Sequence, residues 1–176
     1  MEKLKVIARK LFNDKFQSAA TLAYQRQSIV RINTGSEPLN AMLQGGIESG
    51  SLTEVYGEFR TGKTQLMHTL AVTAQMPIED GGGAGKVMYI DTEGTFRPER
   101  IEQICERFKI DYQAVLENIA YAKANNTEHQ QELLVSAAAL LSEDHFSLII
   151  VDSATNLFRT EFEGRGELSA RQMALG

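Results

Sequence analysis

The stretch GEFRTGKTQ, residues Gly57 to Gln65, has the G-x-x-x-x-G-K-[ST] pattern of a phosphate-binding loop. Gly57 and Gly62 allow the backbone to turn back on itself, so that its amide groups can point at phosphate oxygens. The preceding segment SLTEVYG predicts a strand over 51–57. The following residues predict a helix over 63–76, whose positive N-terminal end faces the same anion. The alternative is a glycine turn beside a helix with an exposed lysine.

Two side chains of this loop have the chemistry that a bound nucleotide requires. Lys63 can reach the β and γ phosphates, and the Thr64 hydroxyl can ligate magnesium. The candidate nucleotide-binding residues of the loop are Gly57, Glu58, Phe59, Arg60, Thr61, Gly62, Lys63, Thr64 and Gln65.

Acidic residues follow two further apolar segments. In SLIIVDS, Asp152 stands at the carboxyl end of a predicted strand, where ligands collect in open α/β sheets, and it is the candidate metal ligand. The alternative is an aspartate that caps a turn. In MYIDTEGTF, Glu93 is the candidate for activating a water molecule, and Asp91 is a supporting or capping residue. Surface acids or magnesium ligands are the alternatives for this pair.

The order of the elements indicates the fold class. The apolar segments VMYID, IAYAK and SLIIVD predict strands, and helices are predicted over 98–109 and 127–142. Earlier in the chain, helices are predicted over 3–13 and 21–30, and a short helix begins near Ser36. Alternating strands and helices predict an α/β domain with a mainly parallel sheet.

Composition excludes several classes of protein. With 176 residues, 43% of them hydrophobic, one soluble domain is expected. The single cysteine, Cys105, excludes an internal disulfide framework, and no apolar run is long enough to cross a membrane. Residues 1–31 carry seven Lys and Arg against two Asp and Glu, so their net charge is +5. The whole chain has −5, which leaves −10 for the remainder and argues against a broad nucleic-acid-binding surface.

Four strings together are more specific than the loop alone: GEFRTGKTQ, MYIDTEGTFRPERI, LIIVDSATNLFRTEF and GRGELSARQM. They resemble the eukaryotic DNA strand-exchange recombinases, the relatives of bacterial RecA. The resemblance runs from about Phe16 to the last residue and is stronger to the general recombinase than to its meiosis-specific paralogue, although EHQQELL favours the latter. It implies a RecA-like P-loop ATPase core, incomplete at the C-terminus.

The resemblance also implies an activity and its partners. Such proteins bind ATP and Mg²⁺ between protomers, form a helical filament on single-stranded DNA, pair it with double-stranded DNA and exchange strands in double-strand-break repair. Recombination mediator proteins, a nuclear location and no membrane association are implied as well. Lys63 and Glu93 become catalytic residues, Thr64 and Asp152 metal ligands, and Arg100 the residue that lies on the adenine. The alternative for Arg100 is a solvated arginine bonded to a glutamine one turn on.

The segment RTEFEGRGELSAR resembles the family's first DNA-binding loop. Arg159 and Arg165 are expected to contact the strand, with Phe162 as an apolar neighbour. From its balanced charge alone, this segment could equally be a solvated loop.

The segment KFQSAAT resembles the element through which this family links one protomer to the next. Phe16 and Ala19 would dock on a neighbour while the extended backbone adds to a sheet edge. The alternative is that Phe16 packs into its own core. The expected walls of the receiving pocket are Met88, Tyr89, Ala120, Ala122, Leu133, Ala137 and Leu140.

The sequence also departs from the family pattern. Residues 1–31 correspond to a remnant of an N-terminal helical domain with its linker and tethering arm, and 32–176 to a partial ATPase core. The chain stops at Gly176, before the family's second DNA loop and further strands. A marginally stable chain with little ATP turnover is therefore expected. A non-catalytic filament-binding module is the second interpretation, and a P-loop kinase the third.

Overall fold

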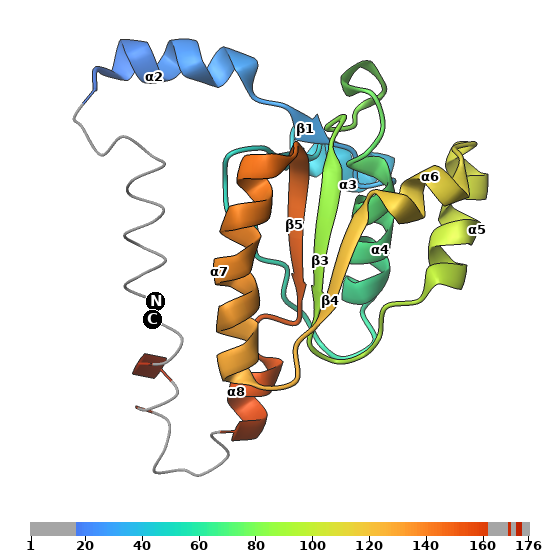
Figure 1. Cartoon of the computed structure of the whole chain (residues 1–176). Coiled ribbons are helices and arrows are strands. Elements are labelled where there is room, and N and C mark those ends of the chain that lie inside the picture. The colour runs from blue at the N-terminus through green and yellow to red at the C-terminus, as the bar shows by residue number, and fades with distance from the viewer. Residues whose placement is uncertain (1–16, 162–168, 170–171, 174–176) are drawn as a thin grey trace.

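The structure, a computed structural model, describes residues 17–161, 169 and 172–173 of the chain (Figure 1). Its centre is a parallel sheet of three strands in the order β4–β3–β5. The strands are β3 (Lys86–Asp91), β4 (Ile119–Lys123) and β5 (Phe146–Asp152). They correspond to the three predicted segments VMYID, IAYAK and SLIIVD, and they confirm the predicted α/β, RecA-like core with a parallel sheet.

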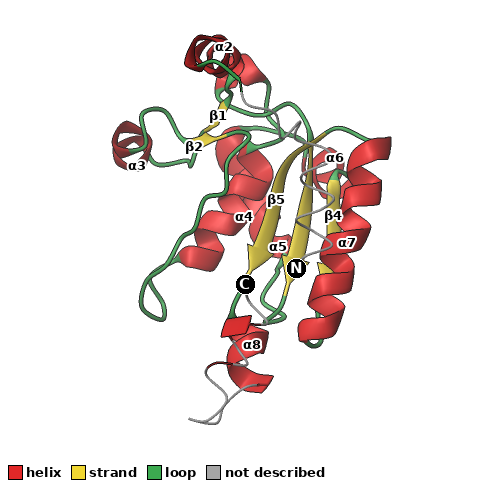
Figure 2. Cartoon of the chain, turned by 90° about the vertical axis from the view of Figure 1, so that its left-hand side faces the viewer, coloured by secondary structure: helices red, strands yellow, loops and turns green. Residues whose placement is uncertain are grey.

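Helices cover both faces of this sheet. Helix α7 (Thr127–Glu143) lies on one face and α4 (Lys63–Thr73) on the other, with α5 (Pro98–Phe108) packed against α4 (Figure 2). These helices confirm the predictions over 127–142, 63–76 and 98–109. The remaining elements are α2 (Ala19–Gln25), α3 (Glu37–Met42), α6 (Tyr112–Glu117), α8 (Asn156–Glu161), the strands β1 (Arg31–Ile32) and β2 (Ile47–Glu48), and the 3₁₀ turns Arg26–Ser28 and Ile78–Asp80.

The central strand β3 explains why the sheet forms from these residues. Val87, Met88, Tyr89 and Ile90 are all buried, as expected of a parallel strand covered on both faces. Since all three strands run in one direction, their carboxyl ends meet at one edge, which we call the carboxyl edge. Asp91 and Asp152 pair in register there.

The strand predicted over 51–57 is wrong. Residues 52–57 form no strand, and Leu52 is 100% exposed and Tyr56 87% exposed. Figure 2 shows this segment as part of a long loop apart from the sheet. An isolated extended segment has no neighbour to bond its backbone groups, so an apolar, β-branched composition does not suffice to make a strand.

The N-terminal elements of the described chain differ from the core. Helix α2 buries none of its residues and extends away from the sheet (Figure 1). With the 3₁₀ turn after it, α2 corresponds to the helix predicted over 21–30, whereas the helix predicted over 3–13 lies outside the described residues. The division at residue 31 stays a prediction.

The short helix predicted near Ser36 is present. Helix α3 begins after Ser36, and the chain then turns at Gly45 and Gly46. At Gly46 a Cβ atom would lie 2.1 Å from the carbonyl oxygen of Ile32, so only glycine fits there. Among the helices of the described residues, none has the length and apolar character to cross a membrane.

Candidate nucleotide-binding site

The phosphate loop leads directly into α4. Gly62 occupies the position before the helix with a φ of 93°, a conformation that glycine adopts without strain. The first residue of the helix is Lys63, so the free N–H groups of the first turn face the loop. The predicted order of loop and helix is therefore present, without the preceding strand.

Lys63 folds back across this loop. Its ammonium group donates hydrogen bonds to the carbonyl oxygens of Gly57 at 2.9 Å and Glu58 at 2.8 Å. The Thr61 hydroxyl also donates to the Glu58 oxygen, at 2.8 Å. The lysine thus satisfies carbonyl groups at the place where its charge would meet phosphate oxygens. A bound phosphate would exchange these bonds for charge-assisted ones.

The rest of the loop is open to solvent. Phe59 is 85% exposed, and the Arg60 guanidinium lies over its ring at 5.2 Å from the centroid. Arg60 has a φ of 65°, which is uncommon for a residue with a side chain. These two residues contact each other rather than the core.

Asp152 ends β5 at the carboxyl edge and is 7% exposed. The Tyr89 hydroxyl donates a hydrogen bond to its Oδ2 atom at 3.2 Å. Burial and then the negative charge of Asp152 raise the pKa of Tyr89, so the phenol stays a donor at neutral pH. The other carboxylate oxygen and the Thr64 hydroxyl are oxygen atoms of the hard type that Mg²⁺ prefers, and their role as metal ligands stays a prediction.

Asp91 holds the loop that contains Glu93. Its Oδ1 accepts the backbone N–H groups of Glu93, Gly94 and Thr95 at 2.8–3.2 Å, and Oδ2 accepts that of Phe96 at 3.0 Å. Although burial alone would raise the pKa of Asp91, the four backbone donors outweigh it and the pKa lies below its usual value. Asp91 is fully buried, which agrees with the predicted capping role.

Glu93 itself is exposed at the carboxyl edge. Its loop is tied to the end of β5 because the Thr92 hydroxyl donates to the Ser153 carbonyl at 2.9 Å and accepts the Ser153 N–H at 2.8 Å. The carboxylate is thus presented to solvent from a backbone that is held on two strands.

Arg100, in the first turn of α5, has two partners. Its Nε donates to Gln65 Oε1 at 2.6 Å, and its Nη1 donates to Gln103 Oε1 at 2.7 Å. The bond to Gln103 is the alternative weighed from the sequence, and the bond to Gln65 connects α5 to the phosphate-loop helix. The Arg100 guanidinium therefore lies near the end of the phosphate loop, where an adenine ring could stack on it.

The predicted DNA-contacting residues are only partly described. Arg159 lies exposed in α8, whereas Phe162 and Arg165 lie outside the described residues. Glu161, at the end of α8, accepts hydrogen bonds from the Thr127 backbone N–H, at 2.8 Å, and from the Thr127 hydroxyl. This carboxylate fixes the start of the predicted DNA loop to the first turn of α7.

The expected walls of the protomer pocket do not all share one face. Met88 pairs with Ala120 in the sheet, and these residues face α7, as Ala122 does two positions on. On α7, Ala137 is buried, Leu133 half-buried and Leu140 exposed. Tyr89 is fully buried on the opposite face, where its ring contacts His68 and Phe96, so it is no wall of a pocket on the α7 side. The mistake is one of strand alternation, because neighbouring residues of a strand point to opposite faces.

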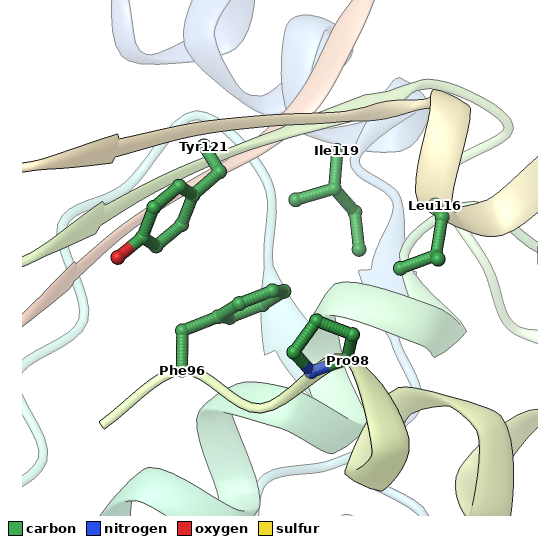
Figure 3. A pocket seen from close by; sticks show the side chains of 5 residues that line it. All are labelled: Phe96, Pro98, Leu116, Ile119 and Tyr121. Atoms are coloured by element: carbon green, nitrogen blue, oxygen red, sulfur yellow. The ribbon is translucent and has the colours of Figure 1, made fainter. Parts of the chain in front are cut away.

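A pocket lies on that opposite face, beside the outer edge of β4. It has a volume of about 380 Å³ and is lined by Phe96, Pro98, Leu116, Ile119 and Tyr121 (Figure 3). In Figure 3 these side chains converge from the loop before α5 and its first residue, from α6 and from β4. The sequence did not single out this pocket, because its lining comes from three separate segments.

Comparison with known proteins agrees with this architecture. A parallel sheet with a phosphate-loop helix at its carboxyl edge is the architecture of P-loop nucleotide-binding proteins, and a RecA-like α/β core is one form of it. The model of the family described as Rad51 matches residues 25–176. The chain belongs to the Rad51 family, and the predicted resemblance is thereby confirmed.

Curated relatives are similar over nearly the whole chain. DNA repair protein RAD51 homolog 1 of Arabidopsis thaliana is 58% identical over 175 residues, which is 99% of this chain and 51% of the relative. RAD51 homolog B of Zea mays is 57% identical over 99% of this chain and 52% of its own length. DNA repair protein RAD51 of Mycosarcoma maydis is 54% identical over 99% of this chain and 51% of its own length. The chain thus spans about half the length of the curated relatives it matches.

Proposed function

We propose that this chain forms the nucleotide-binding half of an ATP-dependent DNA recombinase, which assembles as a filament on single-stranded DNA and pairs it with a homologous duplex in the nucleus. The observation that carries the proposal is the arrangement of one edge: the phosphate loop opening α4, Asp152 ending β5 and the Glu93 loop following β3. Family membership supports a DNA-dependent ATPase, and the printed names of the relatives support DNA repair.

The residues divide the chemistry of hydrolysis among them. Lys63 would neutralise phosphate charge, and Thr64 with Asp152 would hold Mg²⁺, which would stabilise the negative charge that develops during phosphoryl transfer. Glu93 takes a proton from the attacking water, from a backbone that Asp91 keeps in place. Arg100 covers the face of the adenine.

Glu93→Gln tests this assignment. The 176-residue chain is extended by the corresponding C-terminal half of the maize relative, and ATP affinity and turnover are measured separately. The amide cannot take a proton, so turnover is expected to fall at least about a hundredfold with little change in affinity. Glu99→Gln, which removes the same charge from an exposed position in α5, is the control. Equal turnover in both variants would assign the water to another base.

The DNA contact rests on an arginine between two glycines. We propose that Arg165, with Arg159 and Phe162, contacts single-stranded DNA. Arg165→Ala is expected to weaken binding and to reduce the salt slope by about one ion. Lys109→Asn, at the exposed end of α5, is the control for loss of one positive charge. If both variants keep the parent slope, Arg165 does not contact phosphate.

We propose that self-association involves the arm and the edge strand β4. In a strand added to β4, Phe16 and Ala19, three positions apart, would project from opposite faces, and Ala19, which begins α2 after the extended N-cap Ser18, would leave the helix to join that strand. We propose that Phe16 docks on the α7 side, near Ala120 and Ala122, and that the small Ala19 enters the pocket of Figure 3.

Phe16→Glu is expected to give a folded monomer in sedimentation, because an unpaired charge cannot enter an apolar pocket without a large penalty. Tyr24→Glu, an exposed aromatic of the same arm, is the matched control. If the Phe16 variant still assembles like the parent chain, another surface links the protomers.

A second candidate function is a filament-binding module without catalysis. The observation that favours it is the contrast between the ordered β4 edge with its pocket and the exposed segment before the phosphate loop. Assembly without ATP turnover in the unextended chain would support this candidate, and turnover by that chain would exclude it. Mediator proteins would use the same edge in either case.

A further inference from the structure

His68 is a buried polar side chain to which no role has yet been assigned. It lies in α4, one turn after Thr64, and is 1% exposed. Its Nδ1 lies 2.7 Å from the Thr64 carbonyl oxygen, and the backbone N–H of Arg97 donates to Nε2 at 3.0 Å. Because Nε2 accepts, the ring proton is on Nδ1 and is donated to Thr64. The ring therefore joins the first turn of the phosphate-loop helix to the end of the Glu93 loop.

The backbone of the Glu93 loop is held from two directions. The N–H groups of residues 93–96 go to Asp91, which belongs to β3 and so fixes the loop relative to the sheet. The next N–H, that of Arg97, goes to His68 and fixes the loop relative to α4. The Arg97 side chain then closes the loop by donating to the carbonyl oxygens of Gly94 and Phe96.

The orientation of the ring is set by aromatic contacts. His68 stacks on Phe96 with centroids 5.2 Å apart and an interplanar angle of 15°. Tyr89 contacts the ring at 5.8 Å, and the same tyrosine donates its hydroxyl to Asp152. A side chain at this position must carry a donor and an acceptor at opposite ends of a flat, apolar body, and histidine meets all of these requirements.

We propose that His68 is a positioning residue for ATP hydrolysis. It transmits the position of the nucleotide-binding helix to the Glu93 loop through the bond from Arg97 N–H to Nε2. This proposal rests on the proposed hydrolytic function of Glu93. Its consequence is that the rate of hydrolysis depends on His68 while nucleotide affinity does not.

Two substitutions of His68 test its bond to Thr64 and its bond from Arg97 separately. In His68→Gln the side-chain oxygen can take the place of Nε2 and keep the acceptor for Arg97, whereas in His68→Asn the amide nitrogen can take the place of Nδ1 and keep only the donor to Thr64. In the chain extended by the C-terminal half of the maize relative, the Gln variant is expected to keep kcat within about threefold. The Asn variant is expected to lose about tenfold or more, with ATP affinity unchanged in both.

Amide hydrogen exchange at Arg97, followed by NMR in the 176-residue chain itself, provides a readout independent of activity. The amide should stay protected in His68→Gln and exchange faster in His68→Asn. Equal protection in the two variants, or equal kcat, overturns the proposal. Equal loss of kcat accompanied by equal loss of thermal stability also overturns it, because the ring would then only fill space. If the extended parent chain does not hydrolyse ATP, the proposed function fails and the hydrolytic role of His68 with it. The exchange result then decides only whether the link exists.

Discussion

The loop over residues 92–97 and the loop over residues 57–62 both adjoin the carboxyl edge of the sheet, but they are held by different contacts. The first is bonded to three residues outside it: the buried Asp91 of β3, the buried His68 of α4 and the half-buried Ser153 after β5. The second is bonded mainly to itself, through Lys63 and Thr61. The loop that would act on water is fixed before any ligand binds, whereas the loop that would hold phosphate is free to adjust.

The first prediction concerns local opening and has the largest expected effect. Chymotrypsin should cleave after Tyr56 and Phe59, which are 87% and 85% exposed, at least about a hundredfold faster than after Phe96. Phe96 donates its backbone N–H to Asp91 and stacks on His68, so cleavage there requires the loop to open. Mass spectrometry of early fragments gives the order of cleavage. Similar rates at the three sites would contradict the contrast between the loops.

The second prediction tests the buried carboxylate. Asp91→Asn should lower the free energy of unfolding by about 2–3 kcal/mol, because the amide offers one acceptor where four backbone donors and the Tyr121 hydroxyl converge. Urea unfolding measures the loss. Asp111→Asn is the matched control, since Asp111 caps α6 from an exposed position and asparagine caps nearly as well. If the two variants lose the same free energy of unfolding, burial of the Asp91 carboxylate does not contribute to its stabilising effect.

The pH dependence of this difference has a defined sign. The pKa of Asp91 is lower in the folded chain than its usual value of about 3.9. Its contribution to stability is therefore complete above that value and is lost as the pH falls through the folded pKa. The gap in stability between the parent chain and Asp91→Asn should be constant between about pH 5 and 7 and narrow below about pH 4. A gap that widens in acid would contradict the lowered pKa.

The third prediction concerns the phosphate loop. Lys63→Ala should weaken ATP binding about tenfold to a hundredfold, because a charge-assisted bond to phosphate is lost. It should leave the unfolding midpoint unchanged, since the Gly57 and Glu58 carbonyls that Lys63 now satisfies are exposed and water can replace it. Calorimetric titration and thermal unfolding measure the two effects. Destabilisation without loss of affinity would assign Lys63 to the fold alone.

The two loops also show what could be predicted from the sequence. The strands over VMYID, IAYAK and SLIIVD were predictable because each is a short, mostly apolar run, and the helices over 98–109 and 127–142 because they fill the intervals. The segment SLTEVYG was also predicted as a strand, although Thr53 and Glu54 interrupt its apolar residues, and residues 52–57 form no strand. A strand depends on partners distant in the sequence, and no local pattern supplies them.

The candidate site was predictable where chemistry is local. Lys63, Thr64, Glu93 and Asp152 stand at fixed offsets from glycines or strand ends. In contrast, the bond from Tyr89 to Asp152 and the bridge through His68 join residues far apart in the sequence. A histidine at position 68 has no signature in the sequence, because its role depends on the Arg97 backbone arriving opposite its ring.

The last prediction concerns Arg100, which connects α5 to the phosphate-loop helix α4 and has the smallest expected effect. Its guanidinium now bonds to Gln65 and Gln103, so contact with an adenine competes with at least one of these bonds. Arg100→Ala should therefore weaken ATP binding only about threefold to tenfold, since a cation on an exposed aromatic face contributes modestly.

The comparison ligand is inorganic tripolyphosphate, which has no base. Arg100→Ala should leave the affinity for tripolyphosphate unchanged, whereas Lys63→Ala should weaken the binding of tripolyphosphate and of ATP by the same factor. A change in the ratio of the ATP affinity to the tripolyphosphate affinity therefore identifies a contact to the base. Gln103→Ala is the further control, because it removes one competing bond and should raise ATP affinity about twofold or leave it unchanged. If Arg100→Ala weakens the binding of tripolyphosphate as much as that of ATP, the arginine contacts the phosphates. Its bond to Gln65 places it close enough to the phosphate loop to do so.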